Sequence, residues 1–541
     1  MAVPPHRPQL DRDALRERLE KLNAVGIALS GESDIARLTE AILMAAKELA
    51  NADAGTLYIV RDGALHFEIA ITDRLGRKVG GTSGVPVGLP PVPLAHPDGT
   101  PNLNNVVACA ANQDRTIVID DAYIAEGYDF SGTRAFDADL GYRSQSFLSV
   151  PMKNRQGELL GVLQLINALD DAGRIRAFDA DDTHLVESLA SQAAVALTNQ
   201  QLIQSLKALF ESFIGLINLA IDDKSPYTSR HCQRVPVLTM MLAEAAVRTR
   251  QGPLAAFDMD DTDRYALKIA GLLHDCGKIT TPVHVIDKAT KLHTLFDRIA
   301  LIDTRFEVLR RDARIAQLEG HLDEAAYRAR LAGLDDAQAF LHRCNVGGEA
   351  MSDADVARVA EIARWTWHGP QGEVPFLDDD EQENLSIRRG TLTAAERQVI
   401  NHHIDVTIRM LESLPWPRRL AVVPEYAGGH HERMDGRGYP RGLTRDQMSV
   451  PARVMGIADV FEALTARDRP YKPGMQLSQA LTILARMARE QHVDIDLFEV
   501  FVRERVWLDY AREFLPPEQI DEVDEAALLA LAGCDGAKQT A

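Results

Sequence analysis

Paired cysteines, positive charge and long apolar runs are all scarce in this sequence of 541 residues. Its cysteines form no CxxC pair and no regular framework, which favours reduced thiols in the cytoplasm over a disulfide scaffold. They are Cys109, Cys232, Cys276, Cys344 and Cys534. No apolar stretch reaches the length needed to span a bilayer, and the N-terminus lacks the apolar run of a signal peptide. We therefore expect a cytoplasmic protein without a membrane partner.

The formal net charge of −20 argues against general binding to DNA or RNA, which needs a basic surface. A small anionic ligand in a local basic pocket stays possible. Hydrophobic content of 46% is ordinary for a globular protein, and this length predicts two or three domains.

The first part of the chain predicts an α+β module over 16–200, after a flexible proline-rich arm at 1–15. Helices are expected over about 13–29 and 34–50, and 84–105 is rich in Pro, Gly and Asn, typical of a loop. RDG and KNRQGE are predicted hairpin turns. Strand-like runs lie at 56–60, 65–70, 116–120, 146–152 and 159–167.

A long connecting helix is predicted over 183–220, where apolar residues recur at spacings of three, four and seven. They are Leu185, Leu189, Ala193, Ala196, Ile203, Phe210, Ile214 and Ile217. Such a helix either pairs with its copy in a homodimer or packs on its own domains as a linker. Both alternatives stay open.

The C-terminal part, 209–520, shows no strand pattern and predicts an all-α domain, followed by a tail at 521–541. About 294–390 is dense in Asp, Glu, Arg and Ala. We interpret it as a helical insertion, chiefly a solvated appendage, with a clamp over the site or a partner surface as the alternative.

Unusual chemistry is concentrated in HHERMDGRGYP at 430–440, where two histidines precede a glycine-rich turn. Imidazoles and carboxylates are typical ligands of catalytic transition metals, so we searched for more of them at apolar positions. His274 and Asp275 end an apolar helix over 267–273, with Gly277 as a possible C-cap. Burying this pair is costly unless a partner such as a metal compensates.

Helical spacing separates the two histidines of the segment 395–411. His403 shares a face with Val399, Val406 and Met410, whereas His402 shares its face with polar residues, so we expect His403 inside and His402 in solvent. A lone inward histidine is more often an ordinary core residue than a ligand.

Two further residues complete the candidate set. His231 shares an apolar helical face, although Pro236 leaves its placement open, and Asp459 lies within an apolar helix. The full set is His231, His274, Asp275, His403, His430, His431 and Asp459. Seven nitrogen and oxygen ligands suit two metal ions, which together activate water for an in-line displacement at phosphorus. The set predicts phosphoester hydrolysis.

These motifs resemble the HD-GYP branch of the HD superfamily of metal-dependent phosphohydrolases. The resemblance covers about 209–290 and 391–480, including YTSRHCQRV, HDCGK, ERQVINHH, HHERMDGRGYP and IADVFEALTARDRPYK. It implies hydrolysis of cyclic di-GMP to pGpG or GMP with two or three ions, iron or manganese above all. The seven residues would be the metal ligands, with His274 and Asp275 at the catalytic centre.

The resemblance also implies substrate contacts. Lys278 would contact phosphate as a catalytic residue, and Arg469 and Lys472 would bind the ligand. The turn over 436–440 would shape the rim and contact protein partners. Glu432 and Asp435 have a structural interpretation, in which they orient ligands or cap the backbone.

The sequence departs from the family pattern at several positions. Tyr227 stands where some members carry a glutamate for a third metal, so we favour two ions. Thr407 replaces the usual glycine. One extra residue lies between Asp459 and Arg469, and the insertion is absent from compact members.

The N-terminal module resembles a GAF domain over about 20–200, carried by SGTRAFDADLGYRSQSFLSVPMKNRQGELLGVLQLINALD and the upstream pair Asp120 and Asp121. This resemblance implies an antiparallel sheet with helices. A small ligand such as a cyclic nucleotide and a ligand-free dimerisation role are both compatible with it.

The combined prediction is a GAF-regulated cyclic di-GMP phosphodiesterase. Three alternatives stay open: a non-catalytic cyclic di-GMP sensor or docking protein, a phosphohydrolase of another nucleotide, and a structural signalling scaffold. The intact ligand set argues against the first.

Overall fold

The computed structural model describes residues 20–29, 31–224, 231–348, 350–369, 372–467 and 474–534. It divides into two compact units, Met1–Phe210 and Glu211–Ala541. The predicted arm at 1–15 lies outside the described residues, and the exact domain boundaries stay predictions.

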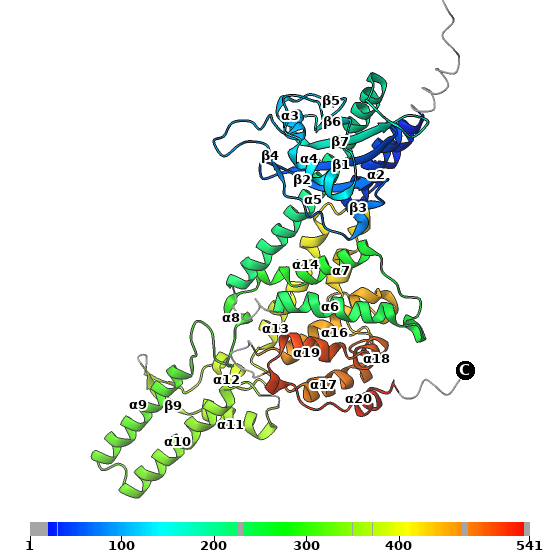
Figure 1. Ribbon diagram of the computed structural model, residues 1–541. Helices are drawn as coiled ribbons and strands as arrows, with labels where there is room; N and C mark the ends of the chain where they lie inside the picture. Colours follow the sequence, from blue (N-terminus) through cyan, green and yellow to red (C-terminus); the bar gives the residue numbers. More distant parts are fainter. Residues whose placement is uncertain are drawn as a thin grey trace, which may run out of the picture. The chain divides into compact units, whose positions relative to one another are not determined.

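The first unit is built on an antiparallel sheet in the order β3-β2-β1-β7-β6-β5 (Figure 1). The predicted RDG turn is confirmed: Asp62 and Gly63 both have positive φ, as a two-residue hairpin turn requires, and they join β1 to β2. The strands are β1 (Ala52–Arg61), β2 (Ala64–Thr72), β3 (Arg77–Gly80), β4 (Val92–Pro93), β5 (Ile117–Ile119), β6 (Phe147–Lys153), β7 (Leu159–Leu169) and β8 (Ile175–Arg176).

Helices cover both faces of this sheet. On one face α2 (Ile35–Leu49), whose N-cap is Asp34, packs with the start of α5 (Ala180–Lys224) over β1 and β7. The other face carries α3 (Val106–Gln113) and the residues around α4 (Ser131–Leu140). Each face therefore has its own apolar core.

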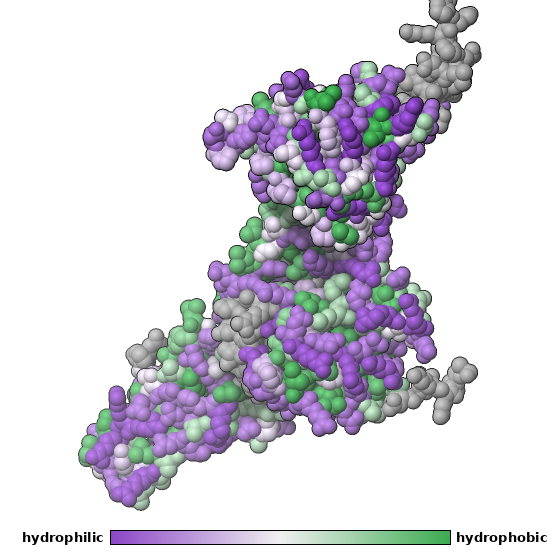
Figure 2. Space-filling model, viewed as in Figure 1, coloured by the Kyte–Doolittle hydropathy of each residue, from purple (hydrophilic) through white to green (hydrophobic). Residues whose placement is uncertain are grey.

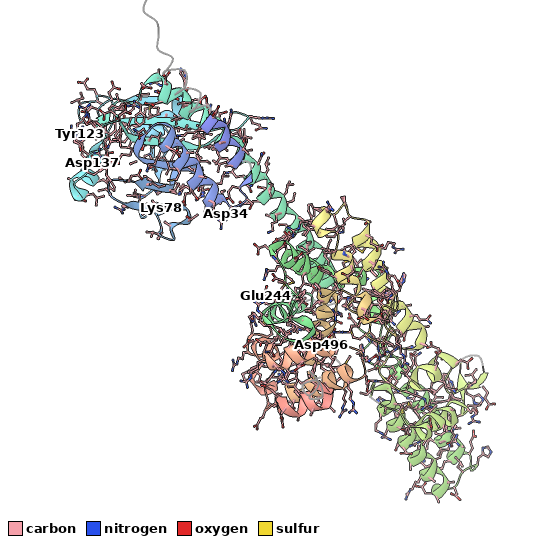
Figure 3. The ribbon with its side chains drawn as sticks, turned by 90° about the vertical axis from the view of Figure 1, so that its right-hand side faces the viewer. Asp34, Lys78, Tyr123, Asp137, Glu244 and Asp496 are labelled. Atoms are coloured by element: carbon pink, nitrogen blue, oxygen red, sulfur yellow. The ribbon has the colours of Figure 1, made fainter. Side chains whose placement is uncertain are left out.

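A buried carboxylate ties α4 to the loop after β5. Figure 3 shows Tyr123 beside Asp137, and the tyrosine hydroxyl donates to Asp137 Oδ2 at 2.7 Å. Ser144 donates to the same carboxylate through its backbone N–H and its hydroxyl. These bonds satisfy an acidic group that is only 2% exposed.

The predicted connecting helix is confirmed as α5, a single helix of 45 residues. Its predicted apolar face is only partly right, because Leu185, Leu189 and Ala193 are buried while Ile203 is 57% exposed. The expectation of no membrane-length apolar stretch also needs correction. By length and composition alone, α5 is long and apolar enough to cross a membrane. This criterion is weak, because some helices of soluble proteins also meet it.

The second unit is mainly helical, with α16 (Val450–Thr465) at its centre and Met455, Ala458 and Phe461 fully buried on it. Its helices outside the insertion are α6 (His231–Arg248), α7 (Asp261–Leu273), α8 (Val283–Ile286), α13 (Ala394–Asn401), α14 (His403–Glu412), α15 (Val423–Gly428), α16 (Val450–Thr465), α17 (Leu477–Arg489), α18 (Ile495–Arg503), α19 (Val506–Phe514) and α20 (Glu525–Ala532). A 3-10 turn, η3 (Cys276–Thr280), follows α7.

The predicted insertion forms a body with its own core of residues such as Phe306, Phe340 and Phe376. Its helices are α9 (Ile299–Leu318), α10 (Glu324–Asn345), α11 (Asp353–Ala363) and α12 (Asp379–Leu385). The prediction of no strands after 209 is wrong here, because β9 (Thr366–Gly369) pairs with β10 (Gly372–Pro375). Four-residue strands are too short to give a readable alternation.

The segment 395–411 is not the one helix that its spacing predicts. It breaks at His402 into α13 and α14, so residues before the break leave the predicted face and Val399 is 43% exposed. The predicted contrast after the break is confirmed: the His403 side chain is 3% exposed and that of His402 is 60% exposed.

Candidate metal centre

The structure brings all seven candidate ligands together from five parts of the chain. His231 begins α6, His274 and Asp275 follow α7, and His403 begins α14. The pair at 430–431 follows α15, and Asp459 projects from α16. Pro236 lies inside α6 rather than at its start, and it packs against Gly271 of α7.

Three of the histidines are held in one orientation by the same local bond. Nδ1 of His274 lies 2.8 Å from the carbonyl of Gly271, and Nδ1 of His403 lies 2.6 Å from the carbonyl of Ile400. His430 repeats the pattern at 2.7 Å from the Ala427 carbonyl. Because a carbonyl only accepts, each Nδ1 carries the proton and each Nε2 keeps a free lone pair.

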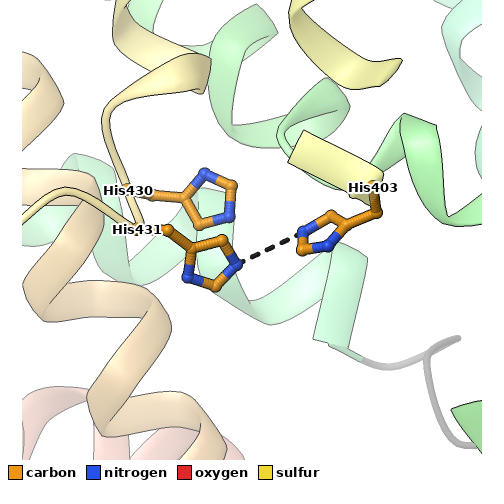
Figure 4. Close-up of side chains that lie close together, drawn as sticks. All are labelled: His403, His430 and His431. Atoms are coloured by element: carbon orange, nitrogen blue, oxygen red, sulfur yellow. Dashed lines mark hydrogen bonds between the residues drawn. The ribbon is translucent and has the colours of Figure 1, made fainter. Parts of the chain in front are cut away.

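These lone pairs face one another across short distances. Nε2 of His274 lies 3.3 Å from Nε2 of His231, and Nε2 of His403 lies 3.2 Å from Nε2 of His431 (Figure 4). Nε2 of His430 is buried with no hydrogen-bond partner. Two nitrogens bound at about 2.1 Å to one ion stand roughly 3.0–3.4 Å apart. The arrangement therefore fits a bound cation better than a hydrogen-bonded core.

Asp275 faces both histidine groups. Its Oδ2 lies 3.3 Å from Nε2 of His231 and of His274, while its Oδ1 lies 3.3 Å from Nε2 of His403. Asp459 adds Oδ1 at 3.2 Å from His231. Ligand atoms lie within 4.8 Å of one another in three groups: His231–His274–Asp459, His274–Asp275–His430 and His403–His430–His431. The residues present thus fit divalent transition-metal ions.

Opposing effects set the charges at this centre. Burial alone would raise the pKa of Asp275, but the Lys278 ammonium beside it lowers the pKa well below its usual range. Burial lowers the pKa of His430 to about 4, so this imidazole is neutral and available as a ligand at physiological pH. Lys278 Nζ donates to Asp275 Oδ2 at 2.6 Å.

Sequence reasoning missed Glu462, one helical turn after Asp459 on α16. Its Oε2 lies 2.5 Å from Nδ1 of His231, and its Oε1 accepts from Arg234 at 2.6 Å. The side chain is 1% exposed. A carboxylate behind a metal-binding histidine fixes the ring orientation and raises its basicity. The i, i+3 spacing from Asp459 was the signal that could have found it.

The turn over 436–440 is held to the centre by backbone caps. Glu432 accepts from the backbone N–H groups of Arg441 and Leu443, and Asp435 accepts from that of Arg437, so their structural interpretation is confirmed. Gly438 leaves no room for a Cβ, which would meet Arg433 N at 2.4 Å. The Tyr439 ring stacks on His431 at a centroid distance of 4.8 Å.

Gly277 and Thr407 pack η3 against α14, and the role of Gly277 differs from the predicted one. Gly277 is not a helix cap, because α7 ends at Leu273 and the glycine lies in η3. A Cβ there would meet the His403 carbonyl at 2.0 Å, so glycine permits close packing of η3 on α14. Thr407 Oγ1 accepts from the Gly277 N–H at 2.9 Å, which explains a threonine at this position.

Three residues of the sequence prediction lie outside the described residues. They are Tyr227 and the predicted ligand-binding pair Arg469 and Lys472. Their roles stay predictions.

Comparison with known families matches two separate parts of the chain. The family described as "GAF domain" matches residues 34–197, and the family described as "HD domain" matches residues 380–497. The chain thus carries a GAF domain followed by a part that matches the HD domain, and GAF–HD protein refers to this pair below. The predicted pair of domains and their order are confirmed. The HD match begins at residue 380, in the last helix of the insertion, so His231, His274 and Asp275 lie outside it.

Curated relatives include enzymes for two cyclic dinucleotides. The chain is 46% identical over 83 residues to 3'3'-cGAMP-specific phosphodiesterase 1 of Vibrio cholerae and 25% identical over 289 residues to phosphodiesterase 3 of that series. It is 38% identical over 114 residues to a cyclic di-GMP phosphodiesterase of Pseudomonas aeruginosa.

Each alignment is partial. The three cover 15%, 53% and 21% of this chain, respectively. They cover only 19%, 37% and 26% of the relatives' own lengths. The activities of these relatives are therefore assigned to the GAF–HD protein only as proposals.

Proposed function

We propose that the GAF–HD protein is a metal-dependent phosphodiesterase that hydrolyses cyclic di-GMP to pGpG or GMP. The observation that carries this proposal is the set of buried imidazole lone pairs that converge on Asp275. Two divalent ions, iron or manganese, would supply an activated water and polarise the phosphate. The proposed ligands are His231, His274, Asp275, His403, His430, His431 and Asp459.

The chain's own residues divide the remaining work. Asp275 directs one carboxylate oxygen to each histidine group and keeps Lys278 beside them. We assign Lys278 to the phosphate of the substrate. Its ammonium contacts Asp275 within the cluster, and its side chain is 18% exposed. Tyr439 covers His431 and limits access of bulk water from that side. Arg469 and Lys472 stay proposed substrate contacts.

The substrate has two candidates, because relatives act on cyclic di-GMP and on 3'3'-cGAMP. We favour cyclic di-GMP on the motif resemblance. The test is turnover of each dinucleotide by full-length protein purified and loaded anaerobically with Mn²⁺ or Fe²⁺. A higher kcat/KM for cyclic di-GMP supports the proposal, and a higher value for 3'3'-cGAMP would replace the substrate while keeping the reaction. Tight binding without turnover of either would instead support the sensor alternative.

A route for regulation by the GAF domain runs along α5. The helix starts against the GAF sheet and ends at Lys224, whose Nζ donates to the carbonyls of Lys278 and Ile279 in η3. Asp275 immediately precedes η3. A shift or rotation of α5 would therefore act directly on the turn that carries Lys278. The ligand of the GAF domain and the sign of the effect stay open.

The proposed homodimer rests on a heptad stripe in α5. Leu202, Leu206, Leu209, Phe213 and Leu216 follow the 4-3-4-3 spacing of a coiled-coil seam, and each is more than half exposed in the single chain. Figure 2 shows apolar side chains along this part of α5. Asn199 continues the seam at an a position, where asparagine specifies register in paired helices. A second copy of the chain is the proposed occupant.

Leu206→Glu is expected to convert a dimer into a monomer at micromolar concentration. The two copies would place facing carboxylates in the seam, and the dissociation constant should rise roughly 100-fold or more. Light scattering after size exclusion measures the mass. Gln204→Glu, on the outer face of the same turn, is the matched control and should stay dimeric. A monomeric wild type, or a dimeric Leu206→Glu variant, contradicts the proposed seam.

A cytoplasmic location stays part of the proposal. All five cysteines are free, which supports a reducing compartment.

A further inference from the structure

A basic cavity lies where the insertion rejoins the HD domain. It has a volume of about 580 Å³, within the usual range of small-molecule sites. Its wall is formed by the end of α12, the linker after it and α13. The lining includes Arg388, Arg389, Arg397, Gln398 and Asn401, with Glu383 as the acidic member.

Two of these guanidinium groups are available for a ligand. Arg388 pairs with Asp353 at 2.5 Å, but within the described part of the chain neither Arg389 nor Arg397 forms an ion pair with a carboxylate. Both side chains are exposed. In a protein with a net charge of −20, a cavity with three arginines and one glutamate is a local attraction for anions.

Arg397 links this cavity to the metal centre. A Cβ at Gly390 would lie 3.9 Å from its Nη2, which places the guanidinium over the linker. On α13, Asn401 lies one helical turn after Arg397, and α14 with His403 at its start follows directly. The cavity also reaches Asn401, two residues before His403.

A buried lysine behind the cavity wall joins the helices of that wall. Lys288 is 2% exposed, and its Nζ donates to Asn384 of α12 at 2.7 Å and to both carboxylate oxygens of Glu396 on α13. This buried contact joins α12 to α13, the helices on either side of the linker with Arg388 and Arg389, and α13 carries Arg397. A rigid wall lowers the entropy cost of binding.

We propose that Arg397, supported by Arg389, binds the second phosphate of a cyclic dinucleotide whose first phosphate lies at the metal centre. This inference rests on the proposed function and assigns a substrate-positioning role to the junction of the insertion. Guanidinium groups bind phosphate in a bidentate manner, which a lysine does not reproduce.

The test compares Arg397→Gln and Arg389→Gln with Arg409→Gln, a matched loss of one exposed arginine on the outer face of α14. We expect Arg397→Gln to raise KM for cyclic di-GMP by roughly tenfold or more with kcat and metal content little changed. Arg397→Lys should recover only part of this loss. If wild type turns over and Arg397→Gln behaves like Arg409→Gln, the inference is overturned while the proposed function stands.

A second arm separates the two proposals. If the metal-loaded wild type hydrolyses neither dinucleotide, the proposed function fails. The cavity is then tested by calorimetric binding of cyclic di-GMP to the full chain, with inorganic phosphate as competitor. Tenfold weaker binding by Arg397→Gln supports the site, and unchanged binding overturns it. Equal competition by phosphate at matched concentration would also overturn it, by showing a general anion site.

Discussion

Asp275→Asn is expected to abolish phosphodiesterase turnover, with a loss of roughly 1000-fold or more. Asparagine keeps the shape of the side chain but replaces one anionic oxygen with an NH₂ group. The structure directs those two oxygens to different histidine groups. The substitution therefore removes an anionic metal ligand that lies between the two groups. It also leaves Lys278 without its carboxylate partner.

The measurement pairs initial rates with metal content per chain. We expect the variant to lose bound metal as well as activity. Asp405→Asn is the matched control, because Asp405 is an exposed acid on the adjacent helix α14 whose partner is His402. Asp405→Asn should keep both activity and metal. Full metal content together with near-normal turnover in Asp275→Asn would show that Asp275 does not hold the ions.

Glu462→Gln is expected to weaken metal binding by roughly 10- to 100-fold without removing any proposed ligand. The carboxylate of Glu462 lies against Nδ1 of His231 and pairs with Arg234. The amide cannot balance the Arg234 charge, and its NH₂ group can turn toward His231 and disturb the ring. Breaking a buried ion pair also costs up to about 3–5 kcal/mol, so the melting temperature should fall.

Metal affinity of the full chain is measured by competition with a chelator of known affinity. Glu425→Gln provides the comparison, because Glu425 accepts hydrogen bonds from Ser449 and has no charged partner in the described residues. That variant should bind metal like wild type. An unchanged affinity in Glu462→Gln, even with lower thermal stability, would restrict Glu462 to a purely structural role.

The fold and the candidate cluster could be predicted largely from sequence because the informative residues are chemically out of place. A histidine–aspartate pair after an apolar helix and an aspartate within α16 both conflict with burial unless a partner compensates. His403 could be separated from His402 because helical spacing assigns adjacent residues to different faces. The structure agrees with that separation.

What sequence could not give is the set of contacts between distant segments. The role of Gly277 depends on the approach of α14, 126 or more positions along the chain, so a local helix-cap interpretation was natural but wrong. Glu462 looked like an ordinary helical glutamate until His231 was placed beside it. The break at His402 and the short β9–β10 hairpin leave no periodic signal in so few residues.

The basic cavity shows the same limit. Arg389 and Arg397 lie eight residues apart in a strongly charged segment. Arginine is common there, so neither residue predicts a binding site by itself. Only the folding of the linker beside α13 brings them to one cavity that also reaches Asn401, two residues before His403.

The central claim is that the seven clustered residues hold two metal ions. The most direct measurement is the number of metal ions per chain, by elemental analysis of full-length protein purified without oxygen and loaded with Mn²⁺ or Fe²⁺. The account predicts two tightly held ions in wild type and fewer than one in the double variant His274→Ala/Asp275→Ala. A wild type that holds no ion, or a double variant that holds as many as wild type, would contradict it.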